Sequence, residues 1–261
     1  MGIFKACDVR GRYGQDLTVE LAGHLGRAVG TELGGSAVVV GGDLRLSTAP
    51  LKRAIIEGLM AAGCRVVDLG VLPTPAFYFA RDLLHIEGAV MVTGSHNPPD
   101  DNGFKICLGP HPITEEEIAA LERRVQSGDF GQGVGAYDRH NVVGPYQEHI
   151  QQAFPAGGRL SVVVDAGNGC YSSIAPGVLR RLGYGVTELF CEPDGRFPDR
   201  SPNPAVAENL RSLCALVTEV SADMGVAYDG DGDRAVFVDN RGRVVSSDVS
   251  IVLFARHLLR R

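Results

Sequence analysis

The sequence has no segment that would place the chain in a membrane or lead it out of the cell. No apolar run is long enough to cross a bilayer, and the opening MGIFKACDVR is charged and lacks the apolar core of a signal peptide. A basic stripe interleaved with aromatic side chains is also missing, and the formal net charge is −6, which disfavours a nucleic-acid surface. We therefore expect a cytoplasmic protein with no membrane and no nucleic-acid partner.

Several catalytic and metal-binding motifs are absent as well. The 6 cysteines include no C-x-x-C pair, which disfavours a zinc cluster and favours reduced thiols packed among apolar residues. Neither the G-x-S-x-G elbow nor the G-x-x-x-x-G-K-[ST] loop occurs, so a Ser-His hydrolase and a P-loop protein gain little support.

Two similar βαβ patterns, at 37–72 and 160–190, organise the chain of 261 residues. Each has an apolar run, a Gly-rich turn, a helical pattern and a second apolar run, and continuous apolar strands are typical of sheets buried on both faces. In the first pattern, Ser47 and Thr48 are expected to cap the helix and Gly63 to end it.

A further apolar strand with a polar end follows each pattern. Open α/β sheets bind ligands at such strand ends, so we expect two consecutive similar α/β domains, each a mixed, mostly parallel sheet between helices, facing a shared cleft. The expected domains cover 1–137 and 138–247, and 248–261 is expected to begin a helix that leads to an absent third domain. The Gly-rich segment 127–144 is expected to hold the boundary as a linker or loop.

The strongest local signal is DGDGDR, in which Asp229, Asp231 and Asp233 alternate with glycines. Three carboxylates on one side of a tight loop repel each other unless a cation neutralises them, and a hard divalent ion prefers oxygen ligands. The alternative is a solvated acidic turn. An EF-hand is disfavoured, because Arg234 stands where its glycine belongs and Asn240 where its glutamate belongs.

A second signal is TGSHNPPDDNGFK, where Ser95 ends an apolar strand. Gly94 is a small neighbour that should keep the hydroxyl accessible, and Asn97 with the two following prolines should stiffen the turn. Alone, this segment could equally be a turn with a surface histidine.

A third signal is FKACDVRGRYG, which places Arg10 and Arg12 in a Gly-containing loop. Arginine binds phosphate through a bidentate fork. Alone, this stretch would more simply be a solvated basic loop.

Together, these segments resemble the α-D-phosphohexomutase family, and most closely its bacterial phosphomannomutase/phosphoglucomutase branch. TGSHNPP resembles the phosphoserine loop, DGDGDR the metal loop and CDVRG the N-terminal loop. GGDLRLST resembles a turn near the phosphate in the first domain, and DGRFPDRSPNP a loop of the second domain. The resemblance covers essentially the whole chain, in the family's order.

This resemblance implies a phosphosugar mutase that interconverts hexose 1-phosphate and hexose 6-phosphate through a phosphoserine enzyme and a bisphosphorylated sugar. Ser95 would carry the phosphoryl group, and its phosphate would complete a Mg²⁺ site with Asp229, Asp231 and Asp233. The implied substrates are mannose or glucose phosphates.

The remaining implied site residues surround the transferred phosphate. His96 and Lys105 would act as acid/base or charge-stabilising groups, and Lys105 is expected to lose its proton more readily than a surface lysine. Arg10 and Arg234 would hold the phosphate, and Asn97 would order the loop.

Two departures from the family pattern stand out. Cys7 occupies a position that is commonly aromatic, which bears on the fine substrate preference. The family's third and fourth domains, which read the sugar and grip its distal phosphate, are not found in these residues. We therefore expect an N-terminal fragment whose missing partners are the C-terminal domains, and which alone isomerises sugar phosphates poorly or not at all.

Two alternatives remain open. A nucleotide-binding α/β protein is supported by AGNGCYSS, which resembles a dinucleotide fingerprint except that Ser172 replaces its third glycine. A non-catalytic remnant that binds a metal or a partner is the other.

Overall fold

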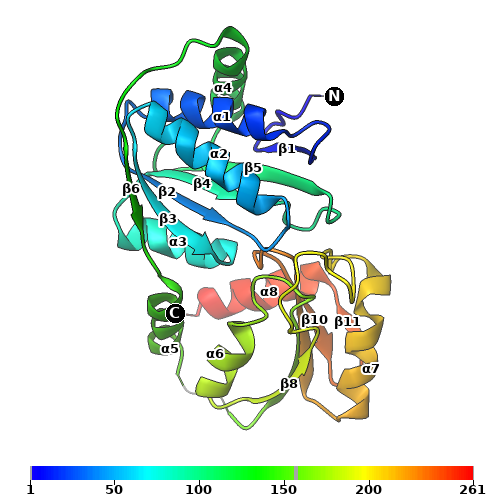
Figure 1. Cartoon of the computed structure of the whole chain (residues 1–261). Coiled ribbons are helices and arrows are strands. Elements are labelled where there is room, and N and C mark those ends of the chain that lie inside the picture. The colour runs from blue at the N-terminus through cyan, green and yellow to red at the C-terminus, as the bar shows by residue number, and fades with distance from the viewer. Residues whose placement is uncertain (1, 156–157, 261) are drawn as a thin grey trace. The chain divides into compact units, whose positions relative to one another are not determined.

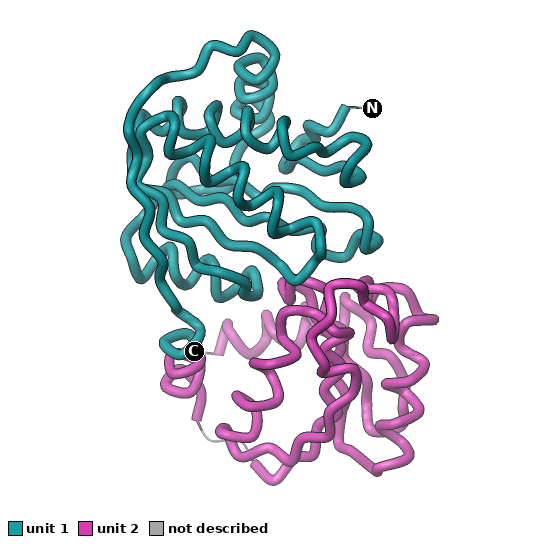
Figure 2. Tube along the Cα trace, viewed as in Figure 1, with its two compact units in different colours: residues 1–146 teal, residues 147–261 magenta. Residues whose placement is uncertain are grey.

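A computed structural model describes residues 2–155 and 158–260. The chain divides into two compact units, Met1–Tyr146 and Gln147–Arg261 (Figure 2). The sequence interpretation placed this division between residues 137 and 138. Strand β6 (Ala136–Arg139) lies across that expected position and pairs in parallel with β3 (Arg65–Val71) of the first sheet.

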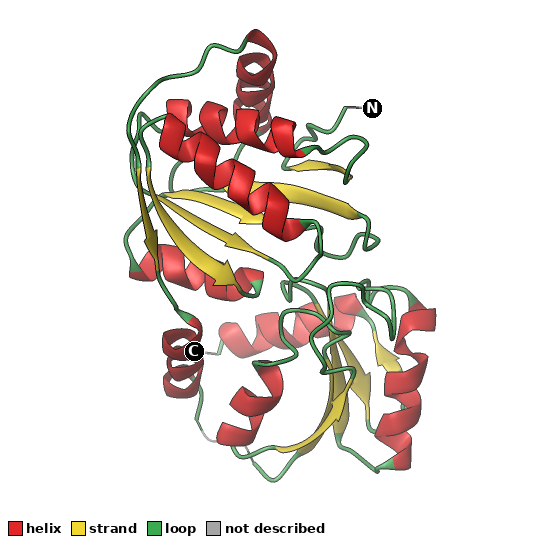
Figure 3. Cartoon of the chain, viewed as in Figure 1, coloured by secondary structure: helices red, strands yellow, loops and turns green. Residues whose placement is uncertain are grey.

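The first unit contains a mixed sheet with helices on both faces (Figures 1 and 3). Its order within the described residues is β1-β5-β4-β2-β3-β6. Neighbours pair in parallel, except that β5 is antiparallel to both β1 and β4. Besides β3 and β6, the elements are β1 (Val9–Arg12), α1 (Val19–Glu32), β2 (Val38–Gly42), α2 (Thr48–Ala61), α3 (Thr74–Leu83), β4 (Gly88–Val92), β5 (Asp101–Cys107) and α4 (Glu115–Ser127). Helix α5 (Val143–Ala153) spans the division between the units.

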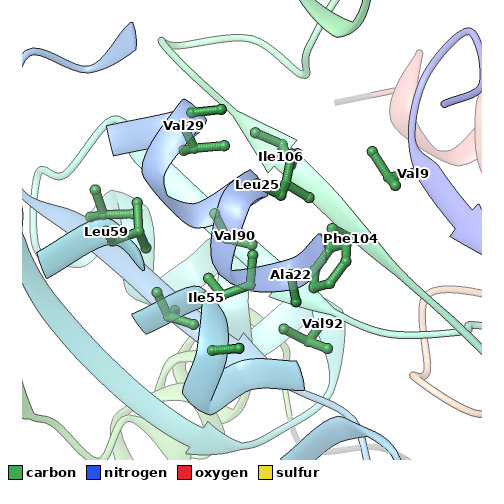
Figure 4. Packing of buried hydrophobic residues seen from close by; sticks show 14 of the residues in the cluster. Val9, Ala22, Leu25, Val29, Ile55, Leu59, Val90, Val92, Phe104 and Ile106 are labelled. Atoms are coloured by element: carbon green, nitrogen blue, oxygen red, sulfur yellow. The ribbon is translucent and has the colours of Figure 1, made fainter. Parts of the chain in front are cut away.

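The core of this unit lies between the sheet and the helices α1 and α2 (Figure 4). Strands β2 and β4 are buried along their whole length, as continuous apolar runs predict. Helices α1 and α2 approach each other at glycines: a Cβ at Gly58 would lie 2.3 Å from the carbonyl oxygen of Gly23. Fully buried side chains of this core include Leu25, Ile55, Leu59, Val90 and Phe104.

The second unit contains a smaller sheet in the order β11-β10-β9-β7-β8 among the described residues. Strand β7 pairs in parallel with β8 and β9, while β10 is antiparallel to β9 and β11. The elements are β7 (Ser161–Asp165), α6 (Ala175–Arg181), β8 (Gly185–Leu189), a 3₁₀ turn η1 (Ala207–Leu210), α7 (Arg211–Glu219), β9 (Met224–Tyr228), β10 (Ala235–Asp239), β11 (Val244–Val245) and α8 (Ser247–Leu258). The Ser246 side chain caps α8 by accepting from the Val249 N–H.

Both βαβ patterns are confirmed, as β2-α2-β3 and β7-α6-β8. The prediction that Ser47 and Thr48 cap α2 is wrong. Ser47 occupies the N-cap but makes no capping hydrogen bond, because its backbone is already helical, at φ −75° and ψ −15°. Its hydroxyl accepts from Asn102 at 2.8 Å. The Thr48 hydroxyl donates to Asp43 instead. Gly63 follows α2 with φ +92°, as expected of a terminating glycine. Among the described residues, no helix combines the length and apolar character needed to cross a membrane.

Candidate functional site

Ser95 lies in the loop between β4 and β5, in a backbone conformation that few non-glycine residues adopt. Its φ is +50°, and its N–H donates to the Thr93 hydroxyl at 2.8 Å. The residue is 0% exposed, so the prediction that a small neighbour leaves its hydroxyl accessible is wrong. Gly94 makes room for Arg45 instead, since a Cβ there would lie 2.4 Å from Arg45 Nε.

The side chain of Arg45 supports this loop by hydrogen bonds to its backbone. It is fully buried and forms an ion pair with the fully buried Asp43 at 3.1 Å. Its Nη2 donates to the Ser95 carbonyl oxygen at 2.8 Å. The further carbonyl groups that accept from its Nη atoms belong to Asn97, Pro98 and Asp101. One guanidinium therefore fixes the backbone on both sides of the Ser95–Pro98 turn.

Asp43, at the end of β2, completes this support. Its carboxylate accepts from the Thr48 hydroxyl at 2.5 Å, the Thr93 hydroxyl at 2.9 Å and the Gly94 N–H at 3.1 Å. It thereby joins the ends of β2 and β4 to the start of α2. The sequence interpretation noticed this turn but missed both supporting residues. The available signal was an acidic and a basic residue, two positions apart, directly after a buried strand.

The other predicted residues of the first unit lie on or beside the same loop. Arg10 donates from Nη1 to the Gly94 carbonyl at 2.8 Å and from Nε to Asp8. The Asn97 amide donates to Asp101 at 3.2 Å. His96, next to Ser95, is half-buried.

Lys105 is also half-buried and lies on β5, where it pairs with Met91 of β4. Because β4 leads into the Ser95 loop, strand pairing ties Lys105 to the strand that carries this loop. Arg12 forms an exposed ion pair with Asp100 at 3.2 Å.

The acidic triplet lies in the second unit, in the turn between β9 and β10. Each of Asp229, Asp231 and Asp233 offers one carboxylate oxygen, and these atoms all lie within 4.8 Å of one another. Asp229 and Asp231 are 0% exposed, and Asp233 is exposed. Buried carboxylates this close repel each other strongly, and a set of oxygen donors fits a hard divalent cation. The triplet can therefore hold a metal ion.

Hydrogen bonds and one ion pair within the loop give this turn its shape. The Arg234 N–H donates to Asp229 Oδ1 at 3.1 Å, and the Arg234 Nε lies 3.8 Å from Asp233. Gly232 has φ +75°, as expected of a glycine in such a turn, whereas Gly230 does not have a positive φ. The carbonyl oxygen of Gly230 instead accepts from the Cys170 N–H at 3.0 Å. This contact attaches the loop of the acidic triplet to the turn after β7.

Comparison with known proteins places both units in one family. The family model for phosphoglucomutase/phosphomannomutase alpha/beta/alpha domain I matches residues 1–132, and the model for alpha/beta/alpha domain II matches residues 144–242. The chain belongs to the phosphoglucomutase/phosphomannomutase family.

Individual relatives agree with this assignment. The phosphomannomutase/phosphoglucomutase of Pseudomonas aeruginosa is 42% identical over 99% of this chain. The phosphoglucomutase of Neisseria gonorrhoeae is 38% identical over the same share. A solved phosphoglucomutase/phosphomannomutase family protein from Burkholderia thailandensis superimposes with a TM-score of 0.95 at 41% identity, covering 99% of this chain and 59% of that one. The chain spans 57% of the length of the two curated relatives.

In the dinucleotide-like segment, other groups of this chain occupy the space beside two of the glycines. A Cβ at Gly167 would lie 2.5 Å from Arg200 Cζ, and one at Gly169 would lie 2.7 Å from the Gly230 carbonyl oxygen. Both glycines thus allow close packing within the chain. The geometry gives no separate support for a nucleotide.

Proposed function

We propose that this chain is the part of a phosphosugar mutase that carries the transferred phosphoryl group on Ser95 and binds Mg²⁺ through Asp229, Asp231 and Asp233. The substrates we propose are the 1- and 6-phosphates of mannose or glucose. The observation that supports this most strongly is the acidic triplet, because two fully buried carboxylates and a third beside them repel one another and offer the oxygen donors that a hard divalent cation prefers.

The reaction we propose is a phosphoryl exchange between Ser95 and a sugar hydroxyl. The bond from phosphorus to Ser95 Oγ breaks as the sugar oxygen bonds to phosphorus, and the proton of the sugar hydroxyl passes through His96 or Lys105 to the leaving Ser95 Oγ. The sugar then carries two phosphates. In the second transfer, Ser95 Oγ bonds to the phosphorus of the sugar's other phosphate, the bond from that phosphorus to the sugar oxygen breaks, and the Ser95 proton passes to the leaving sugar oxygen, which regenerates the phosphoserine and releases the isomer.

Charge neutralisation is the main demand of such a transfer. A phosphoserine brings about −1.5 to −2 charges, and the triplet adds more. Bound Mg²⁺ would offset charge on the phosphate oxygens. Among the side chains, Arg10, Arg234 and Lys105 are the cations that we assign to the phosphate. The Arg10 bond to the Gly94 carbonyl, on the residue before Ser95, supports that assignment.

We propose that the sugar and its non-reacting phosphate are held by sequence that corresponds to the remaining length of the relatives. Binding energy from those contacts would position the reacting groups. For the same reason, we expect this chain alone to isomerise sugar phosphates poorly. Its six cysteines are free thiols, which supports a reducing location such as the cytoplasm.

A chimera tests this function against a non-catalytic role. This chain replaces the aligned part of the Pseudomonas aeruginosa relative, and interconversion of mannose 1-phosphate and 6-phosphate is measured. We expect turnover from the chimera, no detectable turnover from its Ser95→Ala variant, and unchanged turnover from Ser36→Ala, which alters an exposed serine in the first unit. A folded chimera that binds Mg²⁺ but turns over no faster than its Ser95→Ala variant would contradict the proposal.

A further inference from the structure

Arg200 is a buried arginine in the second unit that reaches from a long loop to the ends of two strands. It lies between β8 and η1, and its side chain is 4% exposed. Its Nε donates to both carboxylate oxygens of Asp165, at 2.9 and 2.8 Å. Its Nη2 donates to the carbonyl oxygen of Tyr228 at 2.8 Å. Asp165 ends β7 and Tyr228 ends β9, directly before Asp229.

The surroundings fit the guanidinium closely. Gly167, with φ +49°, has no Cβ where Arg200 lies, and its N–H donates to Asp165 Oδ1 at 2.9 Å. Arg200 Nη1 donates to the Ser201 carbonyl at 3.0 Å. The Arg200 side chain thus joins its own loop to the glycine turn after β7 and to the ends of β7 and β9.

The acceptors of Arg200 bear directly on the metal loop. The Tyr228 carbonyl belongs to the peptide that enters Asp229, so a hydrogen bond to it restrains the first metal-binding residue. The turn beneath Arg200 also donates from Cys170 to the Gly230 carbonyl. The loop that carries the triplet is therefore held on two sides.

We propose that Arg200 is a positioning residue for the metal site: by joining Asp165 to the Tyr228 carbonyl, it presets the loop that presents Asp229, Asp231 and Asp233 to the cation. This inference rests on the metal binding in the proposed function. Residues behind metal ligands orient them, and their loss typically lowers metal affinity about 10–100-fold.

The chain offers a matched control in the same loop. Arg196 forms an ion pair with Asp194 at 2.5 Å, with its side chain 72% exposed. Its described hydrogen-bond acceptors all belong to Asp194. Arg200→Gln and Arg196→Gln therefore remove the same charge from the same loop, but only the first removes a bond to the strand ends.

Mn²⁺ binding to the purified chain, measured by electron paramagnetic resonance, tests the inference. We expect Arg200→Gln to weaken binding about 10–100-fold and Arg196→Gln to leave it unchanged. Arg200→Lys keeps the charge but not the planar fork, so its affinity should fall between the parent and Arg200→Gln. A merely structural role would lower the melting temperature of Arg200→Gln yet leave the affinity of the folded variant at the parent value, and that result would overturn the proposal.

A measurement on the unaltered chain covers the case in which the variants do not fold. Saturating Mn²⁺ should slow amide hydrogen exchange in 164–170 and 199–203 as well as in 226–235. Slowing confined to 226–235 would overturn the inference. If the parent chain bound no Mn²⁺ at all, the proposed metal site itself would fail, which is a different outcome from equal binding by parent and Arg200→Gln.

Discussion

Arg45 donates from Nη2 to the Ser95 carbonyl while its Nε pairs with Asp43, and both charged side chains of that pair are fully buried. The loop that carries Ser95 is thus held by an ion pair whose two side chains are fully buried. Arginine suits this place because its planar fork serves several acceptors at once, whereas a lysine is a point donor.

Arg45→Gln should therefore destabilise the first unit strongly. Removing one member of a buried pair leaves the other charge uncompensated and typically costs about 3–5 kcal/mol. Urea unfolding, followed by hydrogen exchange of peptides from β4 and β5, measures the loss. The control is Arg65→Gln, whose pair with Asp138 is exposed at 63% and 51% and should contribute less than about 1 kcal/mol. Equal losses from the two variants would contradict this account of the loop.

Asp231→Asn should abolish tight metal binding and also stabilise the metal-free chain. The substitution removes one of three closely spaced carboxylates, two of them fully buried, so like-charge repulsion falls together with cation affinity. Thermal unfolding with and without Mg²⁺ measures both effects. Glu219→Gln, an exposed change at the end of α7, is the control. A metal-free Asp231→Asn chain that melts below the parent would argue against a repulsive cluster.

Gly58→Ala should destabilise the first unit although alanine favours helices. The added methyl would lie 2.3 Å from the Gly23 carbonyl oxygen and 2.8 Å from the Arg27 nitrogen, and overpacking costs about 1–3 kcal/mol. Gly177→Ala in α6 is the comparison, because nothing lies within 4 Å of its Cβ position. There the helix preference should stabilise by up to about 1 kcal/mol. In urea unfolding, Gly58→Ala should lower the free energy of unfolding and Gly177→Ala should raise it.

Cysteine alkylation should separate Cys7 from the buried thiols. Cys7 is exposed, whereas burial raises the pKa of Cys64 and of Cys191 to about 11. Because the thiolate is the reactive form, both should stay protonated at pH 8, and their labelling should rise only as the pH approaches 11. Peptide mass spectrometry after iodoacetamide treatment measures this. Cys191 Sγ donates to the Val164 carbonyl oxygen of β7 at 3.5 Å, and equal labelling of Cys7 and Cys191 at pH 8 would contradict that packing.

Apolar strands and the acidic triplet could be predicted from the sequence because their signals are local. Strands β2, β4 and β7 are continuous apolar runs, and the glycines of DGDGDR mark a turn by themselves. Strand β6 was not predicted and lies in the segment expected to be a linker. Its four residues are all exposed, so no hydrophobic pattern marks it, and only its pairing with β3 makes it a strand.

The burial of Arg45 and Arg200 could not be predicted for a different reason. An arginine in a polar loop is usually solvated, and the partners of Arg45 and Arg200 lie far along the chain. Arg45 donates to carbonyl groups more than fifty residues away in sequence. Arg200 pairs with Asp165 at the end of β7, 35 residues before it in sequence. Burial of such a charge depends on which strand ends meet, which a local pattern does not encode.

Phosphorylation of Ser95 tests the central claim most directly. The chimera of this chain with the Pseudomonas aeruginosa relative is incubated with Mg²⁺ and a hexose 1,6-bisphosphate, and the peptide that contains residue 95 is analysed by mass spectrometry. We predict one phosphoryl group on Ser95 and none on the same peptide of Ser95→Ala. A parent peptide that stays unmodified, or a phosphoryl group found on another residue, would contradict the account.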